Sequence, residues 1–133
     1  MKRFLLLFAM AAFVTTGFAQ KKLVLYFSET NTTKAVAEVL QKQLGADIES
    51  IEAVKPYSGN FQETMQRAQS DKEPEIKPLK ADLKAYDVIY LGYPIWGGTY
   101  AAPVVTLVKK YDFAGKTIVP FCTFGSGGLE EST

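Results

Sequence analysis

The feature that most constrains the fold is a change of hydrophobic period within residues 23–40, LVLYFSETNTTKAVAEVL. The first five residues form a continuous apolar run rich in β-formers, which is typical of a parallel strand buried on both faces. From Thr32 onward the apolar residues fall at helical spacing, and Gly45 stands where a helix would end. A strand therefore leads into a helix through a short loop of mostly polar side chains.

The same alternation of strand and helix continues along the chain. The pattern predicts a weaker edge strand at 46–51, a polar helix at 60–71, a buried strand at 87–92, a helix at 102–111 and a last strand at 116–122. The segment 93–100 is expected to be a loop. Alternating strands and helices predict an α/β fold, with an open parallel sheet, helices on both faces and right-handed crossovers.

Three loops leave the carboxyl ends of these strands, at 28–33, 93–100 and 123–128. Ligands bind beyond these ends in parallel sheets, so the three loops are expected to meet in one site. The first loop offers hydroxyl or amide side chains at five of six positions, namely Ser28, Thr30, Asn31, Thr32 and Thr33. Free N–H groups at a helix start bind phosphate. The alternative is an elaborate helix cap, although one residue suffices for a cap.

The second loop, GYPIWGG, places Trp96 just after a strand end. A tryptophan there belongs either to the core or to a stacking platform for a flat ring. The flanking glycines let backbone approach closely and favour the platform. The third loop, TFGSGG, adds backbone N–H groups and Phe124. The three loops together predict a site for a flat ring on a phosphorylated tail.

Several chemistries are excluded by composition. The chain has no histidine, which removes Ser-His and Cys-His nucleophilic catalysis, and no carboxylate cluster has metal-ligand spacing. With one cysteine, no intramolecular disulfide can form. Cys122 follows an apolar run, so a buried inert thiol is favoured over a reactive one. Any chemistry is therefore expected to come from a cofactor.

Residues 1–19 have the layout of a secretory signal peptide, with Lys2 and Arg3 before a long apolar run. The alternative is a membrane anchor, for which the run is somewhat short. We expect export to the periplasm or secretion, a mature domain of residues 20–133, and no membrane association after cleavage. Without Lys2 and Arg3, 13 basic side chains face 14 acidic ones. This neutral balance argues against nucleic acid as a partner.

The sequence resembles the flavodoxins, most closely the small bacterial flavodoxin-like proteins. The resemblance rests on YFS-x-T-x-x-T, YDVIYLGYPIWGG and GKTIVPFCTFGSGG, in order, and covers roughly residues 22–129. It implies a flavodoxin-like parallel sheet with strand order 2-1-3-4. The family continues with a helix and a fifth strand, whereas this sequence stops at Thr133, so the resemblance also implies an incomplete domain.

The resemblance implies FMN as the cofactor. Ser28, Thr30 and Thr33 match the hydroxyls that bind the FMN phosphate, and Asn31 stands where the family commonly has glycine. The matching residues beside the isoalloxazine are Pro94, Ile95, Trp96, Gly97 and Gly98 on one side and Thr123, Gly125, Gly127 and Gly128 on the other, with Phe124 as a second aromatic contact. No catalytic residue is implied, because outer-sphere electron transfer requires none.

The expected function is that of an FMN-binding redox protein, either an electron carrier or a flavin-dependent oxidoreductase. Its partner would be a redox protein or a small-molecule electron acceptor, although a near-neutral chain offers little electrostatic steering. The alternatives are a non-redox binding module on the same fold and an inactive fragment. A bare edge on the last strand would favour dimers, aggregation or marginal stability.

Overall fold

A parallel sheet lies at the centre of the fold in the computed structural model, which describes residues 20–124. Its strands are β2 (Lys22–Tyr26), β3 (Asp47–Ser50), β4 (Val88–Trp96) and β6 (Thr117–Thr123), in the order β3-β2-β4-β6. Numbered along the chain, this is the predicted order 2-1-3-4. A short strand, β5 (Thr99–Tyr100), adds to the end of β4 in antiparallel pairing.

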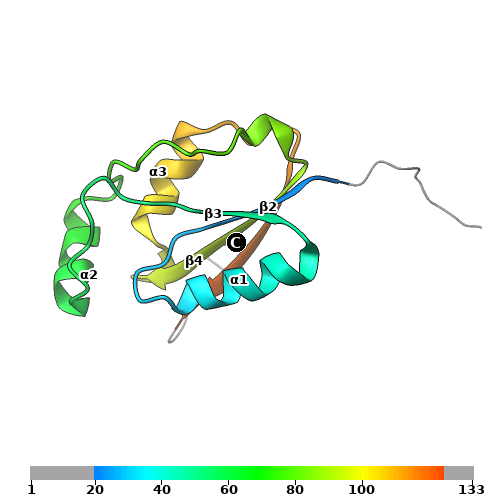
Figure 1. Cartoon of the computed structure of the whole chain (residues 1–133). Coiled ribbons are helices and arrows are strands. Elements are labelled where there is room, and N and C mark those ends of the chain that lie inside the picture. The colour runs from blue at the N-terminus through cyan, green and yellow to red at the C-terminus, as the bar shows by residue number, and fades with distance from the viewer. Residues whose placement is uncertain (1–19, 125–133) are drawn as a thin grey trace, which may run out of the picture.

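Helices cover both faces of the sheet, as predicted. Figure 1 shows α1 (Thr32–Leu44) on one face and α3 (Ala102–Lys110) on the other, while α2 (Phe61–Ser70) lies beyond the carboxyl ends of the strands. Gly45 ends α1 in the left-handed conformation, with φ 61°. Asn60 caps α2 by accepting a hydrogen bond from the Glu63 N–H at 3.0 Å. A 3-10 turn, η1 (Leu83–Ala85), precedes β4.

The core has two parts, one on each face of the sheet, and the alternation of β2 supplies both. Leu23 and Leu25 pack with residues of α3, whereas Val24 and Tyr26 pack with Ala37 of α1. Leu23, Val24 and Leu25 are at most 1% exposed. The strand is therefore buried on both faces, which confirms the reading of its continuous apolar run.

The prediction of a loop at 93–100 was wrong. β4 continues through Trp96, and Ile95 and Trp96 pair with Tyr100 and Thr99 across a hairpin. Gly97 and Gly98 form the two-residue turn, with φ 60° and 87°. Two positive φ values are what a type I′ hairpin turn requires, and glycine adopts them without strain. The other predicted boundaries differ from the observed ones by at most one residue.

The two edges of the parallel strands differ. β3 is the short edge strand that the sequence predicts. β6 pairs with β4, and among the described residues no strand pairs with its other side, where Ile118 and Val119 are 36% and 37% exposed. Residues 1–19 and 125–133 lie outside the described part, and with them the predicted signal peptide and glycine loop. Within residues 20–124, no helix has the length and apolarity of a membrane span.

Candidate functional site

The loop between β2 and α1 presents more polar groups than the helix start uses. Asn31 adopts the left-handed conformation, with φ 68°, and its side chain makes no capping bond. Ser28 Oγ instead accepts a hydrogen bond from the Lys34 N–H at 3.2 Å. The first intrahelical bond runs from the Ala35 N–H to the Asn31 carbonyl, at 3.0 Å. The N–H groups at the first two helical positions therefore have no partner among the described residues.

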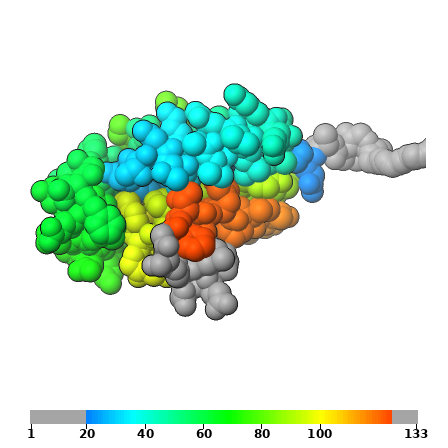
Figure 2. Space-filling model, turned by 90° about the horizontal axis from the view of Figure 1, so that it is seen from below, coloured from blue at the N-terminus to red at the C-terminus, as the bar shows by residue number. Residues whose placement is uncertain are grey.

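The third predicted loop begins beside the first. Thr33 Oγ1 and Thr123 Oγ1 lie 2.9 Å apart in a hydrogen bond, although 90 residues separate them in sequence. Figure 2 shows the end of β6 (orange-red) against the start of α1 (light blue). Thr33 is only 2% exposed, so its hydroxyl joins the two elements from inside. We call these residues the hydroxyl wall: Ser28, Thr30, Thr32, Thr33 and Thr123.

The opposite side is built on aromatic rings. The Trp96 ring forms T-shaped contacts with the rings of Phe27 and Tyr57, with centroids 5.4 and 5.0 Å away and interplanar angles of 89° and 71°. The Arg67 guanidinium lies 4.1 Å from the centre of the Tyr57 ring. Trp96 is half-buried and packs against the main core, yet it also lines an open cleft. Trp96 therefore packs against the core and also faces the cleft, and its role as a platform for a flat ring stays a prediction.

This cleft has a volume of about 330 Å³ and separates the two walls. Ligand pockets commonly span roughly 300–1,000 Å³, so it is large enough to hold a small ligand. The predicted residues that line it are Ser28, Thr30, Thr32, Thr33, Pro94, Ile95, Trp96, Thr123 and Phe124. Asn31, Gly97 and Gly98 do not line it. Gly125, Gly127 and Gly128 lie outside the described residues.

Helix α2 adds a part of the cleft that sequence reasoning missed. The unpredicted lining residues are Glu29, Gly59, Phe61, Thr64 and Met65. With Pro94, Ile95 and Trp96, the three α2 residues form what we call the aromatic wall. Phe61 is 78% exposed, and this aromatic side chain at the start of a polar helix was the one available signal. Thr64 gave no signal.

The Thr64 hydroxyl is the clearest sign that the cleft is built for a ligand. Thr64 is 4% exposed, and its Oγ1 has no hydrogen-bond partner within the described part of the chain. A buried polar group without a partner costs folding free energy, so it usually has a function or a missing partner. A ligand hydroxyl in the cleft would supply such a partner.

The electrostatics of the cleft are nearly neutral. Of the described residues that line it, Glu29 is the one that carries a charge, and none is a lysine or arginine. A bound phosphate would therefore be held by backbone N–H groups and hydroxyls, as the sequence predicts. Within the described residues, no group of His, Cys, Asp or Glu side chains could hold a metal ion. Cys122 is a half-buried free thiol whose pKa is raised by burial, which favours the unreactive protonated form.

Comparison with known proteins agrees with this arrangement. The family model for flavodoxin matches residues 21–133. Flavodoxin 1 of Escherichia coli K12 is 29% identical over 112 residues, which are 81% of this chain and 50% of that protein. The flavodoxin of Klebsiella pneumoniae is 28% identical over the same shares. The chain thus spans about half the length of the curated relatives that it matches.

Two solved structures have the same fold. A candidate flavoprotein from Bacteroides eggerthii is 34% identical, with a TM-score of 0.76 over 86% of this chain and 77% of that one. A flavoprotein from Lactobacillus acidophilus, solved in complex with FMN, is 25% identical, with a TM-score of 0.76 over 86% of this chain and 81% of that one. By its family match, its strand order and its cleft at the strand ends, this chain belongs to the flavodoxin family.

Proposed function

We propose that this chain binds FMN between the hydroxyl wall and the aromatic wall, and that it acts as a redox protein, either an electron carrier or a flavin-dependent oxidoreductase. Membership of the flavodoxin family and the FMN complex of the Lactobacillus acidophilus neighbour support the cofactor. The observation that carries the proposal is the pair of free N–H groups at the start of α1, among hydroxyls and across the cleft from Trp96.

The residues present fit the parts of FMN. The start of α1, with Thr30 and Thr32, would hold the phosphate through neutral donors and the positive end of the helix dipole. The Trp96 side of the cleft would hold the flat ring, with Phe61 and Phe124 at the exposed rim. The unpaired Thr64 hydroxyl would donate to or accept from a polar group between these two ends.

Bound FMN would supply the electron chemistry, and the chain would control its surroundings. The aromatic wall excludes water from one side of the site, because Trp96 is packed against Phe27 and Tyr57. No proton-transfer residue is assigned, since outer-sphere electron transfer requires none.

The phosphate assignment can be tested with the double variant Thr30→Ala with Thr32→Ala. Both side chains are exposed and line the cleft, so the change spares the Thr33–Thr123 link. A lost hydrogen bond to a charged group costs roughly 1.5–3 kcal/mol, so FMN affinity should fall about tenfold or more. Riboflavin, which lacks the phosphate, should bind nearly as before. Titration by flavin fluorescence measures both, with Thr117→Ala on β6 as the control variant.

An equal loss of affinity for FMN and riboflavin would contradict the phosphate assignment. Absence of FMN binding by the unmodified chain would contradict the proposal as a whole. The redox role needs a second measurement, in which the FMN-loaded chain is photoreduced without oxygen and mixed with an acceptor protein or a small-molecule acceptor. FMN binding without reoxidation by either acceptor would favour the non-redox binding module.

We also propose that residues 1–19 direct export, as their basic start and apolar run suggest. Fractionation of cells that express the full sequence would test this, with Lys2→Glu and Arg3→Glu together as the variant. If residues 1–19 direct export, a shortened chain should be found outside the cytoplasm, and the variant should lower its amount. A full-length chain in the membrane fraction would favour the anchor instead.

A further inference from the structure

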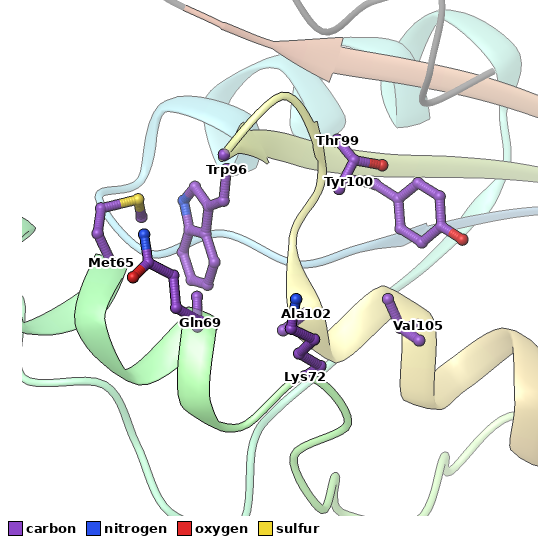
Figure 3. Close-up of a pocket in the computed structure, with 10 residues that line it drawn as sticks. Met65, Gln69, Lys72, Trp96, Thr99, Tyr100, Ala102 and Val105 are labelled. Carbon is purple, nitrogen blue, oxygen red and sulfur yellow. The ribbon is translucent and has the colours of Figure 1, made fainter.

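A second hollow lies beside the cofactor cleft, between α2, the β4–β5 hairpin and α3. Its volume is about 190 Å³. Figure 3 shows the Trp96 ring with Met65 and Gln69 of α2 on one side and Ala102 and Val105 of α3 across the hollow, with Lys72 near its end. We call this hollow the α2–α3 groove.

The groove is distinct from the cleft but adjoins it. Of the residues that the structure describes, Trp96 and Met65 alone line both, so these two side chains form the partition between them. None of the hydroxyl wall reaches the groove. A ligand in the groove would therefore occupy space that the cofactor does not need.

The lining of the groove fits a single flat ring. Met65, Ala68 and Val105 supply apolar contact, and Trp96 supplies an aromatic surface of the kind that rings pack against. An apolar cavity of about 150 Å³ holds benzene, so the groove has room for one six-membered ring.

The charge at the groove fits an anion on that ring. Among residues 20–124, Lys72 is the one charged residue in the lining, and it forms no ion pair with any of them. The acidic residues on either side of it in the sequence already form ion pairs. Asp71 Oδ2 lies 3.8 Å from Arg67 Nε, and Glu73 Oε2 lies 2.5 Å from Lys109 Nζ. Gln69 lines the groove as well, with its amide beside Met65 (Figure 3).

We propose that the α2–α3 groove is a second binding site, for a one-ring aromatic carboxylate. The ring packs against Trp96 and Val105, and the carboxylate meets the Lys72 ammonium. This site requires neither FMN nor the hydroxyl wall, so it stands apart from the proposed redox function.

Benzoate is the probe that tests the site, by NMR on the isotope-labelled full chain. Trp96 is the only tryptophan in the sequence, so its indole N–H gives one assignable signal. Benzoate should shift this signal and the methyl signals of Met65 and Val105 saturably. Benzamide lacks the charge and cyclohexanecarboxylate lacks the flat ring, so each should bind roughly three- to tenfold more weakly. Equal binding of all three, or no saturable shift, would overturn the proposal.

Two pairs of variants locate the site. Lys72→Met should weaken benzoate roughly fivefold, whereas Lys55→Met, at another exposed lysine, should not. Val105→Phe should fill the groove and abolish the shifts, whereas Val108→Phe on the same helix should leave them, because Val108 lies outside the groove. Retained binding in Val105→Phe would overturn the assignment. An FMN titration of the same samples separates the two proposals, since loss of either ligand alone contradicts only its own site.

Discussion

The two walls of the cleft are built in opposite ways. The hydroxyl wall is dense in polar groups, but the fold uses few of them, mainly Ser28 for the Lys34 N–H and Thr33 for Thr123. The aromatic wall centres on Trp96, a ring that the fold does use, because it packs on Phe27 and Tyr57. Polar groups that make no bond within the fold are free to bind a ligand. The hydroxyl wall therefore offers hydrogen-bonding groups to the cleft, whereas Trp96 in the aromatic wall is a part of the core that also faces the cleft.

Removal of the Trp96 ring should have the largest effect. Trp96→Ala loses the contacts with Phe27 and Tyr57, and should lower the free energy of unfolding by roughly 2–4 kcal/mol while weakening FMN. Trp96→Phe keeps a ring and should recover most of the stability. Urea unfolding of the apoprotein measures both. A loss below about 0.5 kcal/mol, typical of an isolated surface residue, would break the comparison, since the wall would then not be part of the core.

The Thr64 hydroxyl of the aromatic wall is buried without a hydrogen-bond partner among residues 20–124, as is the Tyr57 hydroxyl. An orphan buried hydroxyl costs about 1–3 kcal/mol, so Thr64→Val should stabilise the apoprotein by about 1–2 kcal/mol and weaken FMN several-fold. Thr106→Val is the matched control, since its hydroxyl donates to the Pro74 carbonyl at 2.6 Å and its loss should destabilise. If both changes destabilise the apoprotein, the Thr64 hydroxyl contributes to folding stability and is not reserved for a ligand.

Within the hydroxyl wall, a side chain that bonds the backbone should contribute to folding stability, and one that makes no bond should not. Ser28→Ala removes the acceptor for the Lys34 N–H and should cost about 1 kcal/mol, as helix caps do. Thr30→Ala removes an exposed hydroxyl and should change stability by no more than about 0.5 kcal/mol. Thermal melts of the two apoproteins compare them. A similar cost for both would mean that the whole loop serves as a cap.

The smallest effect should come from pH. Burial raises the pKa of the Tyr57 hydroxyl above its ordinary value of 10, and the Arg67 charge lowers it by less. The folded pKa exceeds the unfolded one, so this contribution is complete below about pH 10 and is lost as pH rises through the folded pKa. Tyr57→Phe should therefore lose less stability above about pH 10 than the parent chain. Equal pH profiles for the two proteins would contradict this.

The fold could be predicted because its signals are local. The switch from an apolar run to helical spacing after residue 27 identified β2 and α1, and the repeat of that switch gave the parallel sheet. The hairpin was missed although its signal is also local, because the Gly97–Gly98 pair favours a two-residue hairpin turn as well as close approach of a ligand.

Part of the site could not be predicted because it depends on contacts between residues far apart in the sequence. The hydroxyl wall is almost contiguous in sequence, so its composition stood out. The contribution of α2 depends on where the loop after β3 carries it, and that is set by distant contacts such as the Ala53–Ile76 bridge. The sequence of a polar helix does not show which of its residues will meet a cleft, so Thr64 and Met65 had no local signal.

Gly92 of β4 leaves room for a neighbouring side chain, and this restricts which residues can stand at either position. It pairs with Phe121 of β6, and a Cβ at position 92 would lie 2.2 Å from Phe121 Cζ. The ring occupies the space that any other residue at 92 would need, and Phe121 is two residues from Thr123, which bonds Thr33. The residues at positions 92 and 121 should therefore vary together and not independently. In a library that varies both, glycine persists wherever 121 is aromatic, and larger residues at 92 survive only with a smaller partner.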